Sequence, residues 1–286
     1  MRVVLPKIAL PFLNRELFFF FCSKVNALYR SGHELGLYRS LIEKHRLIEN
    51  PGILFEEPFC RLVMSTLEAW NMNQRGARLA PFDRFLQSVE NNKQNLVELH
   101  NYRLETIHFL SIDERDEIFG LLKTVFSSLS VMDSKRRIVG VSKAMHFLLP
   151  DLVLPIDSSY TLPVFCGYNR PSNDLDQELD TFTDVFLATV RVSKNLNLTV
   201  SDVEGAKWNT SIPKLIDNAT IGATICEVSE IRGLIEAKGI QIPRENWQSF
   251  LKWKRAAAAR KEKAKAEREL LKYVLNHPEL LPEHLR

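Results

Sequence analysis

The chain has 286 residues, of which 45% are hydrophobic and 17 are phenylalanine. This excludes wholesale disorder, because such a chain can bury a core in one large domain or two small ones. It has only 11 glycines, too few for the many tight turns of a β-barrel or sandwich. The net charge of +3 hides an uneven distribution, with +5 on residues 244–286 and −2 on the rest.

The N-terminal half is expected to be a series of helices, because apolar residues recur at the spacing of a helix face. The strongly apolar run from Leu17 to Cys22 is far too short to cross a bilayer, so we expect no membrane contact. Ser111 and Glu114 match a capping box, the clearest helix start in this half. The expected helices cover residues 15–48 with a break at Ser31-Gly32, about 57–70, Pro81 to about His100, and Ser111 to about Leu129.

The C-terminal half is also expected to be helical. A short helix from Ile138 to Leu148 should stop at Pro150, and residues 151–156 should be extended because Pro155 keeps its neighbour out of the helical region. Gly239 is expected to end a helix. The later helices should cover about 175–192, 213–220, 227–238 and 243–276. The sequence therefore predicts an all-α fold.

Residues 244–286 are predicted to form a basic helical tail on a globular body of residues 1–243. Between Lys254 and Glu269 the only apolar residue is alanine, so this stretch cannot bury a hydrophobic face. It is either a solvated helix or an arm that binds nucleic acid. The basic residues expected to contact phosphate groups are Lys254, Arg255, Lys261 and Lys265.

The end of the tail carries an apolar stripe, through which the chain could self-associate or dock a partner helix. The stripe consists of Leu270, Leu271, Val274 and Leu275.

The four cysteines lie far apart in the sequence. Cys22, Cys60, Cys166 and Cys226 show neither the spacing of a zinc knuckle nor that of a redox pair, and four are too few for a disulfide framework. We expect buried thiols in a reducing cytoplasm. The sequence gives no indication of a metal or another cofactor.

Residues 138–160 contain the pattern most suggestive of chemistry. Gly140-Val141, Lys143-Ala144 and Pro155-Ile156-Asp157 resemble the helix-hairpin-helix DNA glycosylases of the endonuclease III type. In that family a hairpin ending in Gly-Val-Gly-x-Lys-x-Ala precedes a helix and then an extended stretch ending in Val-Asp. The run from Ser142 to Asp151 is also similar to prokaryotic proteins to which no activity is attached.

The resemblance implies a glycosylase-like helical body and a role for each matching residue. Lys143 would be the nucleophile that attacks the sugar carbon, and Asp157 would assist it. A lysine nucleophile needs a desolvating pocket that lowers its pKa, and a carboxylate can stabilise a developing sugar cation. Gly140 and Ser142, at the hairpin positions, would bring backbone N–H groups close to a phosphate.

A second candidate site is the polar loop of residues 71–78. Its amides, its glycine and the guanidinium groups of Arg75 and Arg78 could clamp a phosphate or contact a base edge. The same loop could simply cap the preceding helix.

Each candidate also has an ordinary structural explanation. Lys143 could be a solvated helix residue, and Asp157 the N-cap of a helix that begins near Ser158. His146, among apolar neighbours, is expected in the core or at its boundary. Lys214 and Asp217 are expected to form a structural pair on one helix.

Three hypotheses for function follow from these patterns. The first is a DNA base-excision glycosylase or lyase that uses Lys143 and Asp157. The second is a nucleic-acid-binding protein without catalysis, and the third is a helical module for protein interaction through the tail.

Overall fold

The computed structural model describes residues 5–28, 32–74, 77–203 and 207–276, but not the side chains of residues 264 and 270–276. Contacts divide the chain into two units, Met1–Ile240 and Gln241–Arg286, close to the expected boundary at residue 243. Within the described residues the structure contains helices and turns, and its only β-type pairing is an isolated bridge between Leu79 and Met132. The predicted all-α fold class is confirmed.

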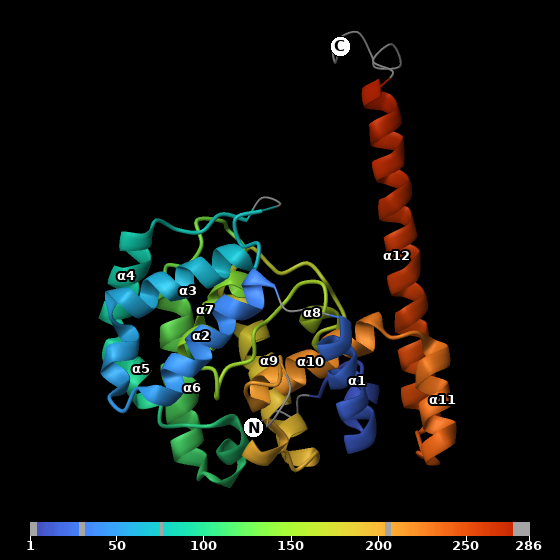
Figure 1. Cartoon of the computed structure of the whole chain (residues 1–286), viewed down its shortest axis with the longest axis horizontal. Helices are drawn as coiled ribbons and strands as arrows, with labels where there is room; N and C mark the ends of the chain where they lie inside the picture. The colour runs from blue at the N-terminus through green and yellow to red at the C-terminus, as the bar shows by residue number, and fades with distance from the viewer. Residues whose placement is uncertain (1–4, 29–31, 75–76, 204–206, 277–286) are drawn as a thin grey trace. The chain divides into compact units, whose positions relative to one another are not determined.

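A few short 3-10 helices lie between groups of α-helices in the first unit, and the second unit is built on one long helix (Figure 1). In chain order the elements are η1 (Leu10–Phe12), α1 (Arg15–Leu28), α2 (His33–Leu47), η2 (Pro51–Phe55), α3 (Glu57–Ala69), α4 (Phe82–Asn91), α5 (Lys93–Leu99), η3 (Leu104–Phe109), α6 (Ile112–Ser128), α7 (Ile138–Leu148), α8 (Thr161–Phe165), α9 (Leu175–Asn195), η4 (Val200–Val203), α10 (Ile212–Ile225), α11 (Val228–Lys238) and α12 (Arg244–Asn276).

Several helix ends follow the local sequence signals. Ser111 and Glu114 form the predicted capping box: the Ser111 hydroxyl accepts from the Glu114 backbone N–H at 3.2 Å, and the Glu114 carboxylate accepts from the Ser111 N–H at 2.8 Å. Gly239 ends α11 in the left-handed conformation, with φ of +62°. Such signals act within one turn of helix, so sequence alone can identify them.

Other helix ends differ from the expectation. The helix predicted from Pro81 to His100 is two helices, α4 and α5, which meet at Asn92. Asn92 is buried; its side chain donates to the Ser88 carbonyl at 2.7 Å and accepts from the Ser128 hydroxyl at 2.9 Å. The helix expected near Ser158 is α8, which begins at Thr161. Tertiary contacts and turns therefore set these ends, not propensity.

Helices α1 and α10 lie side by side, far apart in the sequence (Figure 1). A Cβ atom added at Gly222 of α10 would lie 2.1 Å from the Phe21 carbonyl oxygen of α1. The Cys22 thiol lies 3.3 Å from the Leu215 carbonyl oxygen. Only glycine permits so close an approach of the two backbones, and α10 carries two residues of the site described below.

Helix α7 lies in the core, and its residues from Gly140 to Leu148 are all buried. It contacts α2, α3, α6 and α9. A Cβ at Gly140 would lie 2.3 Å from the Met132 sulfur, so the glycine admits that side chain. The sequence from Gly140 to His146 is thus surrounded by protein on most sides.

The second unit contains α12, whose first part holds the buried residues Phe250 and Trp253. From Arg255 to Glu269 almost every described side chain is exposed. None of the described helices has a stretch of the length and apolarity that crossing a membrane requires.

Candidate functional site

Lys143 and Asp157 meet in the folded chain. The Lys143 Nζ atom lies 3.3 Å from Asp157 Oδ2, and the two side chains are 10% and 26% exposed. Lys143 Nζ also lies 3.8 Å from the Met72 sulfur and 5.7 Å from the centre of the Trp70 ring. The Lys143 amine is therefore largely desolvated and lies beside one carboxylate, so Lys143 is not the solvated helix residue of the structural alternative.

Ser142 and Thr161 position Asp157. The Ser142 hydroxyl on α7 accepts a hydrogen bond from the Ile156 N–H at 3.1 Å, which ties the extended stretch to the helix that carries Lys143. The Thr161 hydroxyl accepts from the Asp157 N–H at 3.0 Å. Asp157 Oδ1 accepts from the Ser159 N–H at 2.6 Å. One carboxylate oxygen thus closes a local turn, while the other faces the lysine.

A second lysine–aspartate pair lies close to the first. Lys214 Nζ on α10 is 2.5 Å from Asp217 Oδ2, and both side chains are only 5% exposed. Lys143, Asp157, Lys214 and Asp217 all line one cavity of about 450 Å³. Burial raises the pKa of the Asp217 carboxyl, and the neighbouring Lys214 ammonium opposes that rise. Two amines and two carboxyl groups therefore converge on one cavity.

Two tryptophans form an apolar wall of this cavity. Trp70 and Trp208 line it, with ring centres 6.5 Å apart and planes tilted by 56°. Lys214 Nζ lies 5.3 Å from the Trp70 ring centre and 5.4 Å from that of Trp208. Both ammonium groups thus face aromatic rings, which stabilise a cation less than water does.

A buried hydrogen-bonded chain supports the tryptophans from behind. Tyr38 packs against both rings, at 5.3 and 6.0 Å between ring centres. His146 Nδ1 lies 2.7 Å from the Val153 carbonyl. Because a carbonyl only accepts, Nδ1 carries the proton, and Nε2 accepts from the Tyr38 hydroxyl at 2.8 Å. The Tyr38 oxygen then accepts from the Thr210 hydroxyl at 2.7 Å.

His146 is consequently a neutral core residue. It is fully buried, and burial lowers its pKa to about 3. The expectation of a core histidine is confirmed.

Amide side chains hold the segment that carries Trp208. The Asn26 carbonyl oxygen accepts from the Trp208 N–H at 2.8 Å, and the Asn218 amide donates to the Trp208 carbonyl at 3.1 Å. Both amides also donate to the Asn209 side chain, at 3.0 and 2.9 Å. The α1–α10 contact therefore fixes this wall of the cavity.

The predicted role of Gly140 and Ser142 as phosphate contacts is wrong for this structure. Both residues lie inside α7 and are buried. The N–H groups of Arg137 and Ile138, at the start of α7, donate to the buried carboxylate of Glu178 at 2.8 and 3.1 Å. The Glu178 carboxylate thus binds the N–H groups at the start of α7, where a phosphate of a bound nucleic acid would otherwise bind.

The polar loop contributes one described residue to the cavity, Asn71, which has a positive φ of 61°. Arg78 is exposed and does not line this cavity. Arg75 lies outside the described residues. The Asn73 side chain accepts from the Leu79 N–H at 2.9 Å, which is an ordinary role in a loop.

The basic residues of the tail are presented on the surface of α12. Arg255, Lys261 and Lys265 are exposed, and Lys254 is half-buried. Lys265 Nζ lies 3.8 Å from Oε1 of Glu269, and the two residues form an ion pair one helical turn apart. The side chains of Leu270, Leu271, Val274 and Leu275, the predicted apolar stripe, lie outside the description.

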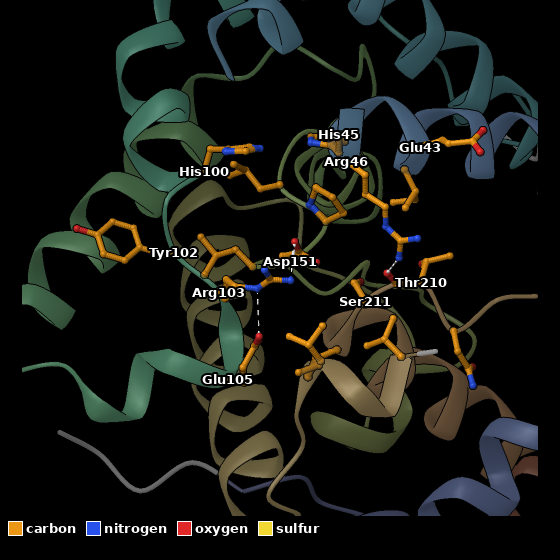
Figure 2. A pocket seen from close by; sticks show the side chains of 18 of the residues that line it. Glu43, His45, Arg46, His100, Tyr102, Arg103, Glu105, Asp151, Thr210 and Ser211 are labelled. Atoms are coloured by element: carbon orange, nitrogen blue, oxygen red, sulfur yellow. Dashed lines mark hydrogen bonds and ion pairs between the residues drawn. The ribbon is translucent and has the colours of Figure 1, made fainter. Parts of the chain in front are cut away.

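A larger cavity of about 930 Å³ lies elsewhere in the first unit. Figure 2 shows Arg103 there between Asp151 and Glu105, at 3.2 and 3.1 Å, and Arg46 reaching the Thr210 carbonyl. His45 and His100 stack on one side, with ring centres 5.7 Å apart. Of the predicted site residues that the structure describes, none lines this cavity. We place the candidate site in the smaller cavity because its ionisable groups converge.

No protein-family model, curated protein or solved structure matches this chain. Among the residues that the structure describes, no three histidine, cysteine or acidic side chains are grouped to hold a metal ion.

The structure adds residues that sequence reasoning did not assign to the site. Trp70, Trp208 and Tyr160 line the cavity, and no motif marks them. Lys214 and Asp217 had a signal, since they are a charged pair within an otherwise apolar helix start, but the expectation for them was structural.

Proposed function

We propose that this protein acts on nucleic acid in the cytoplasm as a base-excision DNA glycosylase or lyase, with Lys143 as nucleophile and Asp157 as its assistant. The observation that carries the proposal is the contact of these two groups, 3.3 Å apart, on the wall of a cavity. The resemblance over residues 138–160 gives the chemistry, and the burial of Lys143 supports it.

In the proposed reaction, the neutral Lys143 amine attacks the sugar carbon C1′ of a damaged or abasic nucleotide. In a damaged nucleotide the bond from C1′ to the base breaks, and the base leaves with the bonding electrons and takes up a proton from solvent; in an abasic nucleotide the C1′ hydroxyl group takes up the proton and leaves as water. The amine loses a proton to Asp157 as the new C–N bond forms. Asp157 then passes that proton to O4′ as the C1′–O4′ bond breaks and the C=N bond of the imine forms. The Asp157 carboxylate also stabilises positive charge on the sugar. The tryptophan wall suits a base turned out of the stack.

Borohydride trapping tests the proposal. An imine between Lys143 and the opened sugar should be reduced to a stable protein–DNA adduct on abasic duplex DNA or on at least one damaged duplex. Lys143→Ala should abolish it. Lys123→Ala, which removes an exposed lysine of α6, should leave it intact. The proposal fails if no adduct forms across a lesion panel, or if a folded Lys143→Ala variant traps DNA as well as the parent.

Exposed basic side chains along α12 favour a second candidate, a nucleic-acid-binding protein without catalysis. Binding should then weaken steeply with salt, because phosphate contacts release counterions. Asp157→Asn should leave the affinity largely intact. Affinity that does not change with salt would reject this function.

The third candidate, a helical interaction module, depends on the apolar stripe at the end of α12. Self-association through the stripe would be lost when residues 256–286 are removed, as measured by analytical ultracentrifugation. If the truncated body instead unfolds, the tail belongs to the core.

A further inference from the structure

The Lys214–Asp217 pair is the more buried of the two lysine–aspartate pairs in the cavity. Its side chains are 5% and 5% exposed, against 10% and 26% for Lys143 and Asp157. The pair is nonetheless open to a ligand, because both residues line the 450 Å³ cavity.

The helix geometry makes this pair short and rigid. Residues three apart lie on the same face of a helix, and Ser211 caps α10 by accepting from the Lys214 N–H at 3.3 Å. The Lys214 amine is confined between Asp217 and the rings of Trp70 and Trp208. It therefore has little water around it and one carboxyl group as its close polar neighbour.

Burial raises the pKa of the Asp217 carboxyl and so favours its protonated form. A carboxylic acid 2.5 Å from the Lys214 amine can donate a proton to an oxygen that forms beside it, and its carboxylate can then accept a proton from the nitrogen.

We infer that Lys214 is a second reactive amine, one that condenses with aldehydes entering the cavity, and that Asp217 holds and returns the proton. The inference goes beyond the proposed function, since it concerns a different lysine and small carbonyl compounds. It rests on that function only if the natural aldehyde is an opened deoxyribose.

The reaction balances without an oxidant or a reductant. The Lys214 lone pair forms a bond to the carbonyl carbon, the π electrons move to oxygen, and the oxygen takes the proton from Asp217. The nitrogen then gives a proton back to the Asp217 carboxylate. That proton passes to the hydroxyl group, which leaves as water as the C=N bond forms.

Labelling of the full chain with glycolaldehyde and cyanoborohydride at pH 7 tests the inference. The added hydride reduces each imine, and peptide mass spectrometry gives the rate at every lysine. Lys214 should be labelled at least about tenfold faster than the exposed Lys123, because Asp217 lies within hydrogen-bond distance of the Lys214 amine and can donate and accept the protons of the condensation. Denaturation in guanidinium should remove the preference.

Variants separate proton transfer from simple access. Asp217→Asn should reduce the Lys214 rate to that of Lys123 or below, and Asp217→Glu should restore part of it; circular dichroism must show both folded. If Asp217→Asn does not fold, the Glu variant and the denatured control decide the result. The inference is overturned if Lys214 in the native chain is labelled no faster than Lys123, or if only Lys143 is labelled preferentially.

The assay contains no DNA, so its outcome is distinct from that of the trapping experiment. Rapid labelling of Lys214 without any DNA adduct would uphold this inference and reject the proposed function. A DNA adduct at Lys143 without preferential labelling of Lys214 would do the reverse.

Discussion

The Ser142 hydroxyl accepts a hydrogen bond from the Ile156 N–H at 3.1 Å, and this bond places Asp157 beside Lys143. Ser142 directly precedes Lys143, and Ile156 directly precedes Asp157, so the bond holds the two site residues close together. The bond joins two segments that the sequence pattern links only by resemblance.

Removing this hydroxyl should loosen the site. Ser142→Ala leaves the buried Ile156 N–H without its partner, which should cost about 1–3 kcal/mol of unfolding free energy. Urea unfolding followed by circular dichroism gives the value. Ser23→Ala removes an exposed hydroxyl that bonds only to the preceding turn of its own helix, at 2.7 Å from the Phe20 carbonyl, and should change stability by less than about 0.5 kcal/mol. Equal effects of the two changes would show that the Ser142 bond does not contribute.

The contact between α1 and α10 should be intolerant of a single methyl group. In Gly222→Ala the new Cβ would meet the Phe21 backbone, which cannot rotate away as a side chain can. We expect a loss of about 1–3 kcal/mol or more from overpacking. Gly233→Ala is the matched control, because no atom lies within 4 Å of the added Cβ, and alanine there should stabilise α11 by up to about 1 kcal/mol. Thermal melting compares the two, and an unchanged melting temperature in Gly222→Ala would contradict the close approach.

Stability should fall in acid because two histidines, the buried His146 and the half-buried His45, are neutral in the folded chain. Burial lowers the pKa of His146 to about 3 and that of His45 to about 4, both below the value in the unfolded chain, about 6.5. The unfolded state therefore binds more protons in this window. Stability is full above about pH 6.5 and falls as the pH drops toward 3, by up to about 1.4 kcal/mol per pH unit for each histidine.

Urea unfolding at pH 7, 6, 5 and 4.5 measures this dependence. His146→Gln should be less stable at pH 7, because it perturbs a packed hydrogen-bonded chain, but its stability should change less steeply with pH. A slope identical to that of the parent chain would mean that His146 does not titrate as described.

The sequence predicts most helices because their signals are local. The capping box at Ser111 and the left-handed Gly239 act within one helical turn, so they needed no knowledge of the fold. The break at Asn92 was missed because its cause is the part-buried hydrogen bond from the Ser128 hydroxyl, which only the packed structure contains. Periodicity does not show where a helix must end to satisfy a distant neighbour.

The site residues also fall into two groups: those that a local pattern predicts, and those that only the packing of distant helices brings to the cavity. Lys143 and Asp157 were found from a short pattern of residue types, but the pattern placed Gly140 on a hairpin, whereas the Met132 side chain packs against it inside α7. Trp208 reaches the cavity because the Asn26 and Asn218 amides hold its backbone. Such convergence depends on how α1 packs on α10, for which the chain offers no local signal.

The exposed basic side chains of α12 should control the salt dependence of nucleic-acid binding. Replacing Arg255, Lys261 and Lys265 by Gln in the full chain should weaken binding to duplex DNA and reduce the slope of log K against log salt by up to about 0.9 for each lost phosphate contact. Fluorescence anisotropy between 50 and 300 mM salt gives the slope. Over this range the Debye length falls by roughly half. Glu262→Gln on the same helix should not weaken binding, and an unchanged slope in the triple variant would remove the tail from the interface.

The last prediction concerns the charge of Asp157. Asp157→Asn can keep the turn, because the amide oxygen can still accept from the Ser159 N–H. It removes the charge that faces Lys143, so the free energy of unfolding should fall by more than the few tenths of a kcal/mol expected for an exchange of capping residues. A double-mutant cycle with Lys143→Met measures the coupling between the two side chains.

In the proposed reaction, Asp157→Asn should lower the single-turnover trapping rate by orders of magnitude, because it loses both the proton acceptor and the charge that stabilises the sugar cation. Loss of stability with full trapping would make Asp157 a structural partner of Lys143, and loss of trapping in a variant that stays folded would make it part of the chemistry.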